Sequence, residues 1–337
     1  MHFKNESCDR LLFYGLKKED YNIIWDVVDT VMFLPTVFGN TLILISIVRF
    51  RKLRTKIHIL IGHLAVNDLL VGATLLPLEA LGDTFGMSKR KGYCLAKLSA
   101  FALLSGGSCL GLLLISLERF CSVAFPLRHA FFTKTKLSFV MLFGWIYVGF
   151  WTLSPAFGCN NIKKNETEVE CNASVIWGGW CKFGMNVNFV LSLVINVGLY
   201  LVVVVTAVRR VKEHGRQTGT STCLCKSREM SKTVTMAAVL GLFALFWLPY
   251  AAMTLIITIQ DHCVQILYHV RRWFLLLGLF NCSINWIIYG LRNKDFREAF
   301  SLILKTNKLS CRRDRKVGCA TKQCTVNVIE MDTELFP

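Results

Sequence analysis

Five polar side chains interrupt long apolar stretches of the sequence, where they could do chemistry. They are Asn40, Asp68, Ser108, Asn281 and Asn285. Polar groups placed in lipid are costly and usually functional, and a carboxylate among hydroxyl and amide oxygens suits a hard cation. The residues alone leave two interpretations open. They slightly favour a hydrogen-bonded knot that fixes helix packing over a small hydrated cation site.

Two charged residues, Arg119 and Glu229, are expected at the same depth. A helix from Cys94 to Arg119 measures about 38 Å at about 1.5 Å per residue. Cys94 therefore marks one membrane surface and Arg119 marks the opposite one. Glu229 precedes Trp247 by whole helical turns and shares its face. Glu229 could be a solvated acid at the surface, or it could approach Arg119 across the bundle.

An aromatic stripe forms one face of the helix expected over residues 233–259. Phe243, Trp247, Tyr250 and Thr254 recur at helical spacing, and Pro249 among them removes a backbone hydrogen bond and predicts a kink. Such a stripe is more often ordinary packing than a binding wall. The sequence shows no nucleophile–base pair and no cluster of metal ligands, so we do not expect an enzyme.

Apolar helices must position these residues. The chain has 337 residues, of which 53% are hydrophobic and only 18% are charged, whereas about 25% are charged in soluble proteins. No charge occurs from Thr30 to Val48, which is long enough to cross a bilayer. We predict an all-α membrane protein, a seven-transmembrane helix bundle with spans at 27–48, 57–81, 93–123, 137–157, 184–208, 233–259 and 271–291. This excludes a soluble enzyme, a disordered chain and, because the runs do not alternate in polarity, an outer-membrane barrel.

The charges predict the orientation of the bundle. Most of the 39 Lys and Arg residues fall on one side of the predicted spans, and such loops face the cytoplasm. We therefore expect an extracellular N-terminus at 1–26 without a cleaved signal, a membrane domain at 27–291, a short amphipathic eighth helix at 292–304 and a cytoplasmic tail at 305–337. The excess charge of +17 then reflects topology and attraction to anionic membrane lipid, and it requires no nucleic acid.

Sequons and cysteines agree with this orientation. Asn5, Asn165 and Asn172 begin glycosylation sequons in predicted outer segments. The outer cysteines, whose pairing the residues leave open, are Cys8, Cys94, Cys159, Cys171, Cys181 and Cys263. Cys311 lies among basic residues shortly after the amphipathic stretch, where it is a candidate for palmitoylation or a free cytosolic thiol.

The spans carry an ordered set of markers that resembles the rhodopsin-like (class A) G-protein-coupled receptors. They are Gly39-Asn40, Leu64-Ala65-Val66-Asn67-Asp68, Glu118-Arg119-Phe120, Pro126-Leu127, Trp145, Tyr200, Phe246-Trp247-Leu248-Pro249, Asn285-Trp286-Ile287-Ile288-Tyr289 and Asp295-Phe296-Arg297. Three positions depart from the family pattern: Trp286 and Ser192 replace prolines, and Phe120 replaces a tyrosine. These departures concern the efficiency of activation more than the fold.

The resemblance implies a plasma-membrane receptor that binds an extracellular ligand and activates a heterotrimeric G protein. The coupling residues it implies are Glu118, Arg119, Leu127, Tyr200, Glu229, Trp247, Pro249, Asn285 and Tyr289. The alternative is a membrane channel or transporter, but those folds typically show internal repeats and paired broken helices, and this chain shows no repeat.

The resemblance also changes the interpretation of the polar residues. It makes Asp68, Ser108, Asn281 and Asn285 an allosteric sodium site, with no cofactor required. It implies that Arg119 and Glu229 form an ion pair in the inactive state. It further implies a disulfide between Cys94 and the second outer loop, with Cys171 as the better partner.

The wall of the ligand site that the resemblance implies contains no charged residue. Its residues are Phe101, Leu104, Ser105, Trp247, Tyr250, Ala251, Thr254 and Leu275. Amine receptors carry an aspartate where this chain has Phe101, and opsins carry a lysine where it has Leu279. The resemblance therefore implies a small neutral or weakly polar ligand, or a peptide. A faint similarity to adenosine-like receptors is opposed by Thr254, which stands where an asparagine is expected.

Overall fold

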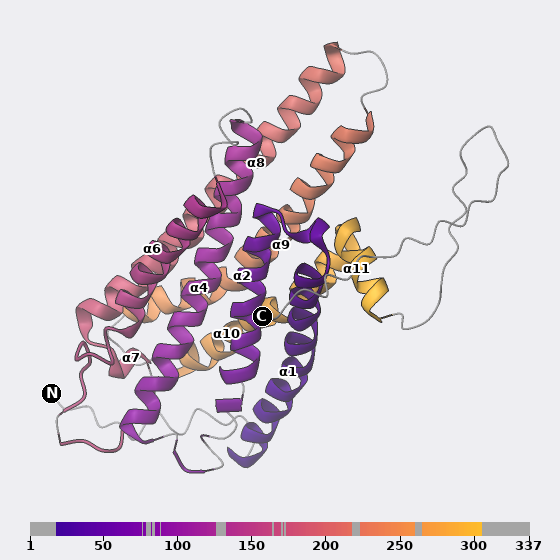
Figure 1. Ribbon diagram of the computed structural model, residues 1–337. Helices are drawn as coiled ribbons and strands as arrows, with labels where there is room; N and C mark the ends of the chain where they lie inside the picture. The colour runs from indigo at the N-terminus through magenta and orange to yellow at the C-terminus, as the bar shows by residue number, and fades with distance from the viewer. Residues whose placement is uncertain are drawn as a thin grey trace.

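The computed structural model describes residues 18–75, 77–78, 82, 85–87, 89–125, 133–163, 165–169, 171, 173–217, 223–259 and 265–304. Long helices dominate this part of the chain (Figure 1). They are α1 (Lys18–Arg49), α2 (Lys56–Leu70), α4 (Lys91–Ala124), α6 (Lys134–Leu153), α8 (Gly179–Gln217), α9 (Cys223–Ile259) and α10 (Gln265–Arg292). Shorter elements are η2 (Arg51–Leu53), the π-helical η3 (Val71–Leu75), α7 (Ala173–Ile176) and α11 (Lys294–Leu304).

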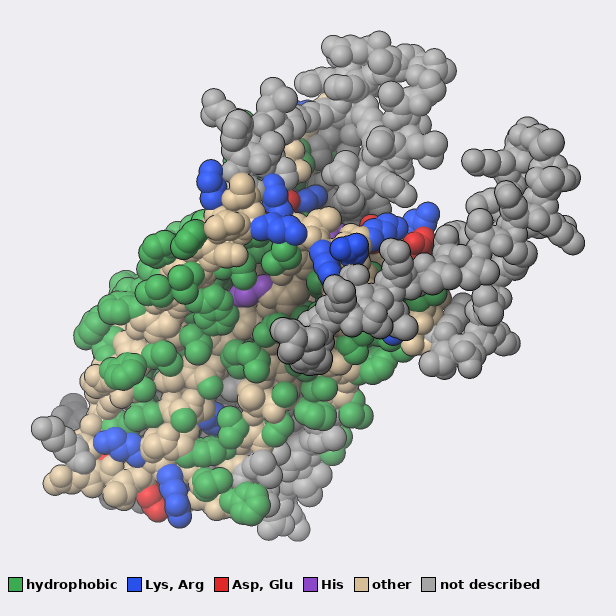
Figure 2. All heavy atoms as spheres, viewed as in Figure 1, with side chains coloured by type: hydrophobic (Ala, Val, Ile, Leu, Met, Phe, Trp, Pro, Cys, Tyr) green, Lys and Arg blue, Asp and Glu red, His purple; other side chains and the backbone are tan. Residues whose placement is uncertain are grey.

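Seven of these helices are long and apolar enough to cross a membrane, as the sequence predicts. Figure 2 shows apolar side chains along the bundle and Lys and Arg side chains gathered toward its ends. The predicted amphipathic helix is also present as α11, which buries Phe296, Ala299 and Phe300. The predicted all-α fold is therefore confirmed.

Three helices extend well beyond the predicted spans. α1 begins at Lys18 rather than at residue 27, α8 continues to Gln217 and α9 begins at Cys223. In Figure 1 the extended ends of α8 and α9 project beyond the bundle at the end that carries α11. Hydropathy marks where a helix is in lipid, whereas backbone hydrogen bonds can continue the helix into water.

α1 and α10 pack closely because a glycine faces a tryptophan. A Cβ atom added at Gly39 would overlap the indole ring of Trp286. Polar bonds reinforce the contact: the hydroxyls of Thr36 and Ser283 lie 2.6 Å apart, and Asn40 Nδ2 donates to the Cys282 carbonyl at 3.0 Å. The unusual Trp286 is thus accommodated on α1, and α10 stays helical through this position.

Two further side-chain hydrogen bonds join neighbouring helices. Trp145 Nε1 on α6 donates to His63 Nε2 on α2 at 2.9 Å. The Ser116 hydroxyl on α4 donates to Asn196 Oδ1 on α8 at 3.3 Å, and both residues are buried. The first bond ties α6 to α2, and the second ties α4 to α8.

We predict that Gly39→Leu destabilises the protein by roughly 1–3 kcal/mol, the usual cost of overpacking. Thermal unfolding of the full-length protein in detergent measures the effect. Gly198→Leu is the matched control, because a Cβ added at Gly198 on α8 meets no atom within 4 Å.

Combining Gly39→Leu with Trp286→Ala tests the cause. The smaller residue removes the overlap, so the double variant should lose much less stability than the two single losses added together. Additive losses would contradict the proposed contact.

Candidate functional site

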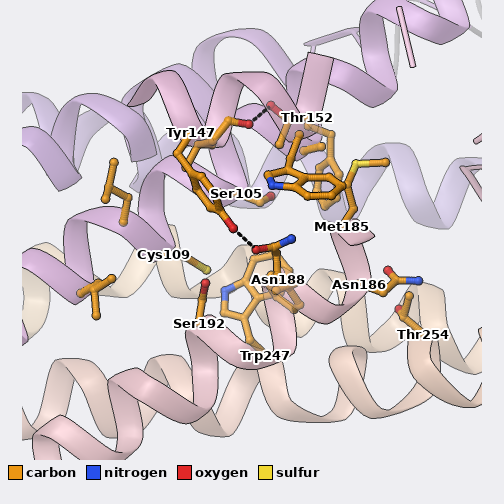
Figure 3. A pocket seen from close by; sticks show the side chains of 18 of the residues that line it. Ser105, Cys109, Tyr147, Thr152, Met185, Asn186, Asn188, Ser192, Trp247 and Thr254 are labelled. Carbon is orange, nitrogen blue, oxygen red and sulfur yellow. Dashed lines mark hydrogen bonds between the residues drawn. The ribbon is translucent and has the colours of Figure 1, made fainter. Parts of the chain in front are cut away.

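A cavity of about 190 Å³ lies among α4, α6, α8 and α9 (Figure 3). Of the ligand wall implied by the sequence, the residues that line the cavity are Phe101, Ser105, Trp247, Tyr250 and Thr254. The other three lie elsewhere. Leu104 is buried in a cluster with Val71 and Cys282, while Ala251 and Leu275 belong to the main apolar core.

The ligand wall implied by position contains no residue of α6 or α8, yet both helices contribute to this cavity. Tyr147 and Thr152 on α6, and Asn188 and Ser192 on α8, all line it. Polar residues recurring within two apolar spans were the available signal. None of the described residues that line the cavity is Asp, Glu, Lys, Arg or His, so its polar character comes from hydroxyl, amide, thiol and indole groups.

Trp247 separates the cavity from the bundle interior. Its side chain is only 4% exposed, and its ring centroid lies 5.5 Å from that of Phe189 and 5.6 Å from that of Tyr250. On its other side it packs against α10, where a Cβ added at Gly278 would lie 2.9 Å from the indole. A molecule in the cavity would therefore touch a side chain that also contacts α10.

The loop between α6 and α8, which is the predicted second outer loop, covers one end of the cavity. Disulfides join Cys94 to Cys171, the pairing that the resemblance implied, and Cys159 to Cys181 at the start of α8. Trp177, which lies between Cys171 and Cys181 in the chain, lines the cavity. Asn165 is exposed on this loop. Asn5, Asn172 and Cys311 lie outside the described residues.

The polar residues in the middle of the bundle meet around Asp68. Asn285 Nδ2 donates to Asp68 Oδ2 at 2.7 Å, and the Ser108 hydroxyl donates to Oδ1 at 3.5 Å. Asp68 is fully buried, and Asn281 is 2% exposed. The amide oxygens of Asn281 and Asn285 are buried without a hydrogen-bond partner among the described residues. The cluster is thus a hydrogen-bonded knot that also presents free oxygen acceptors.

Arg119 is held by its neighbour in the chain. Its Nε donates to Glu118 Oε2 at 2.6 Å, and the two residues are 7% and 2% exposed. The implied partner, Glu229, lies within α9, but its side chain is outside the described part, as is Leu127. The pairing of Arg119 with Glu229 therefore stays a prediction.

The remaining switch residues lie on α8, α9 and α10. Tyr200 is partly buried against the core, and α9 remains helical through Pro249. Tyr289 is 1% exposed and stacks on Phe296 of α11 with ring centroids 5.4 Å apart. α10 thereby contacts α11 at the end of the bundle that carries Arg119.

Ion pairs join α11 to η2. Lys52 Nζ lies 2.6 Å from Asp295 Oδ1 and 3.5 Å from Glu298 Oε2. The hydrogen bond with Asp295 is the main cause that raises the pKa of Lys52 above its ordinary value. Because Lys52 is largely exposed, solvent screens the pair and its contribution to stability is small.

Comparison with known proteins agrees with this geometry. The family model "7 transmembrane receptor (rhodopsin family)" matches residues 39–289. A histamine H2 receptor of Cavia porcellus is 30% identical over 83% of this chain and 79% of its own length. A D(5)-like dopamine receptor of Takifugu rubripes is 26% identical over 82% of this chain and 66% of its own. A trace amine-associated receptor 13c of Danio rerio is 28% identical over 80% of this chain and 82% of its own length.

These relatives are receptors, not enzymes, channels or transporters, and they are named for amines rather than for adenosine. The match of the family model covers most of the membrane domain. The chain therefore belongs to the rhodopsin family of seven-transmembrane receptors, and it is a multi-pass plasma-membrane protein that responds to a ligand and couples to G proteins.

Proposed function

We propose that this receptor binds a small, neutral, largely apolar molecule in the cavity among α4, α6, α8 and α9. The observation that carries the proposal is the absence of a charged side chain from the described lining. An ammonium group in this cavity would be desolvated without a counter-charge, which is costly. The roof formed by the second outer loop favours a small molecule over a peptide.

The relatives named for histamine, dopamine and trace amines favour a second candidate, an amine ligand. The two candidates differ at one position. Phe101 lines the cavity at the point where the family resemblance places the aspartate of amine receptors. An aromatic ring there offers an amine no full counter-charge.

The two ends of the bundle differ, and this difference favours one orientation of the receptor in the membrane. The disulfides involve Cys94 and Cys181, near the starts of α4 and α8, and an oxidising compartment preserves such bonds. Lys52 in η2, Lys134 at the start of α6 and Arg119 near the end of α4 lie toward the other end of the bundle. We infer that the N-terminus is extracellular and that the end carrying Arg119 faces the cytoplasm. A ligand that displaces Trp247 would then move α9 about Pro249 and uncover Arg119 for the G protein.

The ligand class is tested with the full-length receptor in cell membranes, by ligand-stimulated binding of a non-hydrolysable GTP analogue. We expect no response to histamine or dopamine and a response within a panel of neutral lipophilic compounds. Phe101→Asp should lower the potency of a neutral hit about tenfold or more, because a buried carboxylate costs free energy. Phe101→Leu is the control, and activation of the wild type by either amine would overturn the proposal.

We predict that Arg119→Ala abolishes ligand-stimulated G-protein activation while the receptor still reaches the cell surface. Because this change removes the ion pair between Arg119 and the buried Glu118 carboxylate, the double change Arg119→Ala with Glu118→Gln provides a second variant. Arg90→Ala, which removes an exposed cation at the other end, should signal normally. Coupling that persists in both Arg119 variants, at matched surface expression, would exclude this role.

We further propose that the Asp68 cluster holds an allosteric sodium ion. A carboxylate, a hydroxyl and buried amide oxygens without partners suit a small hard cation. Sodium bound there would favour the inactive arrangement. The same residues would otherwise act only as the hydrogen-bonded knot described above.

The sodium proposal is tested without a ligand, by replacing sodium chloride with N-methylglucamine chloride at constant ionic strength. Basal G-protein activation should rise several-fold in the wild type, in line with a coupling free energy of about 1–3 kcal/mol, and Asp68→Asn should abolish the difference. Asp295→Asn, a change at a partly exposed carboxylate, should keep the sodium response. A wild type indifferent to sodium would leave the packing knot as the role of the cluster.

A further inference from the structure

The cavity extends to the lipid-facing surface between α6 and α8. Tyr147 lines the cavity and is itself 55% exposed. The neighbouring Phe143, Ile146 and Phe150 on α6 are 67%, 59% and 65% exposed, so this side of α6 faces the membrane. Gly144 also lines the cavity, and Leu110 of α4 packs directly against it, since a Cβ added at Gly144 would lie 2.5 Å from Leu110 Cδ1.

A polar bridge between Tyr147 and Asn188 spans this opening. The Tyr147 hydroxyl donates to Asn188 Oδ1 (Figure 3). Asn188 Nδ2 in turn donates to the Gly184 carbonyl at 2.7 Å. Polar side chains at a lipid-facing seam are unfavourable unless they pair with each other. The bridge therefore satisfies both groups when the seam is closed, and it can open by one rotation of the Tyr147 side chain.

The outer end of the cavity is closed more firmly than the seam. The two disulfides tie the second outer loop to α4 and α8. Backbone hydrogen bonds fold the loop on itself, from Asn161 N to the Ile176 carbonyl at 2.8 Å and from Gly178 N to the Cys159 carbonyl at 3.1 Å. The Trp177 indole N–H is buried, without a hydrogen-bond partner among the described residues, beneath this roof.

We propose that the ligand reaches the cavity from the bilayer, through a portal between α6 and α8 whose gate is the Tyr147–Asn188 hydrogen bond. This inference rests on the proposed function, because only a neutral lipid-soluble molecule can take that path. The portal selects a molecule with an apolar body. The Trp177 indole N–H selects a hydrogen-bond acceptor, such as a carbonyl or ether oxygen, at one end.

The test uses the full-length receptor in phosphatidylcholine vesicles and a neutral aryl diazirine that partitions into the bilayer. After brief illumination, adducts are mapped by mass spectrometry on Ser105 and Cys109 inside the cavity. Phe143 and Phe150, which face lipid, serve as the internal reference. The wild type should carry adducts at both places. A sulfonated, membrane-impermeant diazirine added outside should not label the cavity.

Variants of the seam should change the ratio of cavity to reference adducts. Tyr147→Phe removes one hydrogen bond and should raise the ratio about threefold to tenfold. Ser192→Phe, one turn beyond Asn188 on the same face of α8, should lower it by filling the seam. Ile146→Ala is the control, because Ile146 adjoins Tyr147 in the chain but does not line the cavity.

Three results would overturn the portal: cavity residues without adducts in the wild type, a ratio unchanged in Tyr147→Phe and Ser192→Phe, or cavity labelling by the impermeant probe. These failures are distinct from a failure of the proposed function. The labelling needs no agonist, whereas the ligand class is decided by the response to amines. A receptor that responds to neutral compounds but fails the labelling test admits its ligand from outside.

Discussion

Hydrogen bonds between polar side chains set the packing of the spanning helices. Lipid tails offer an apolar side chain as favourable a surrounding as another helix does, so apolar burial alone cannot choose a partner for each helix. A polar side chain, in contrast, must find a partner within the bundle. Asp68 satisfies this requirement with Asn285 on α10 and Ser108 on α4, and thereby links three helices near the middle of the membrane.

The replacement of a family proline by Trp286 shows how a local departure is absorbed. Proline would remove a backbone hydrogen bond from α10 and bend it, whereas Trp286 leaves the helix continuous. The indole needs space, and Gly39 on α1 supplies it. The contact of Phe38 with the same indole, at a centroid distance of 5.6 Å, adds an edge-to-face pair. Where the family pattern has a proline that bends the helix, this chain has a tryptophan that joins α10 to α1.

The sequence predicts the bundle well because its signals are local. The helical rise converts the length of each apolar run and the spacing of Cys94 and Arg119 into distances across the membrane, and the basic clusters mark one side of it. The cavity is harder to predict, because its wall depends on how helices rotate about their axes. Position alone placed Leu104 and Leu275 in the wall, whereas the packing of α4 and α10 turns them toward other neighbours. Tyr147 and Asn188 were not predicted, since their role arises only when α6 and α8 meet.

The cavity and the Asp68 cluster share one mechanical element. Trp247 contacts α10 at Gly278, and Asn281 and Asn285 follow on the same helix at spacings of about one and two turns, on the same face. A close-packed helix transmits displacement along its length because its interior has little free volume. A molecule that pushes Trp247 toward or away from Gly278 therefore shifts Asn281 and Asn285, and the Asn285 amide donates to the Asp68 carboxylate. The link is reciprocal, since whatever fixes the position of Asn285 also limits how far Trp247 can move. The small residue at Gly278 is what allows this contact, because any side chain there would separate the indole from α10.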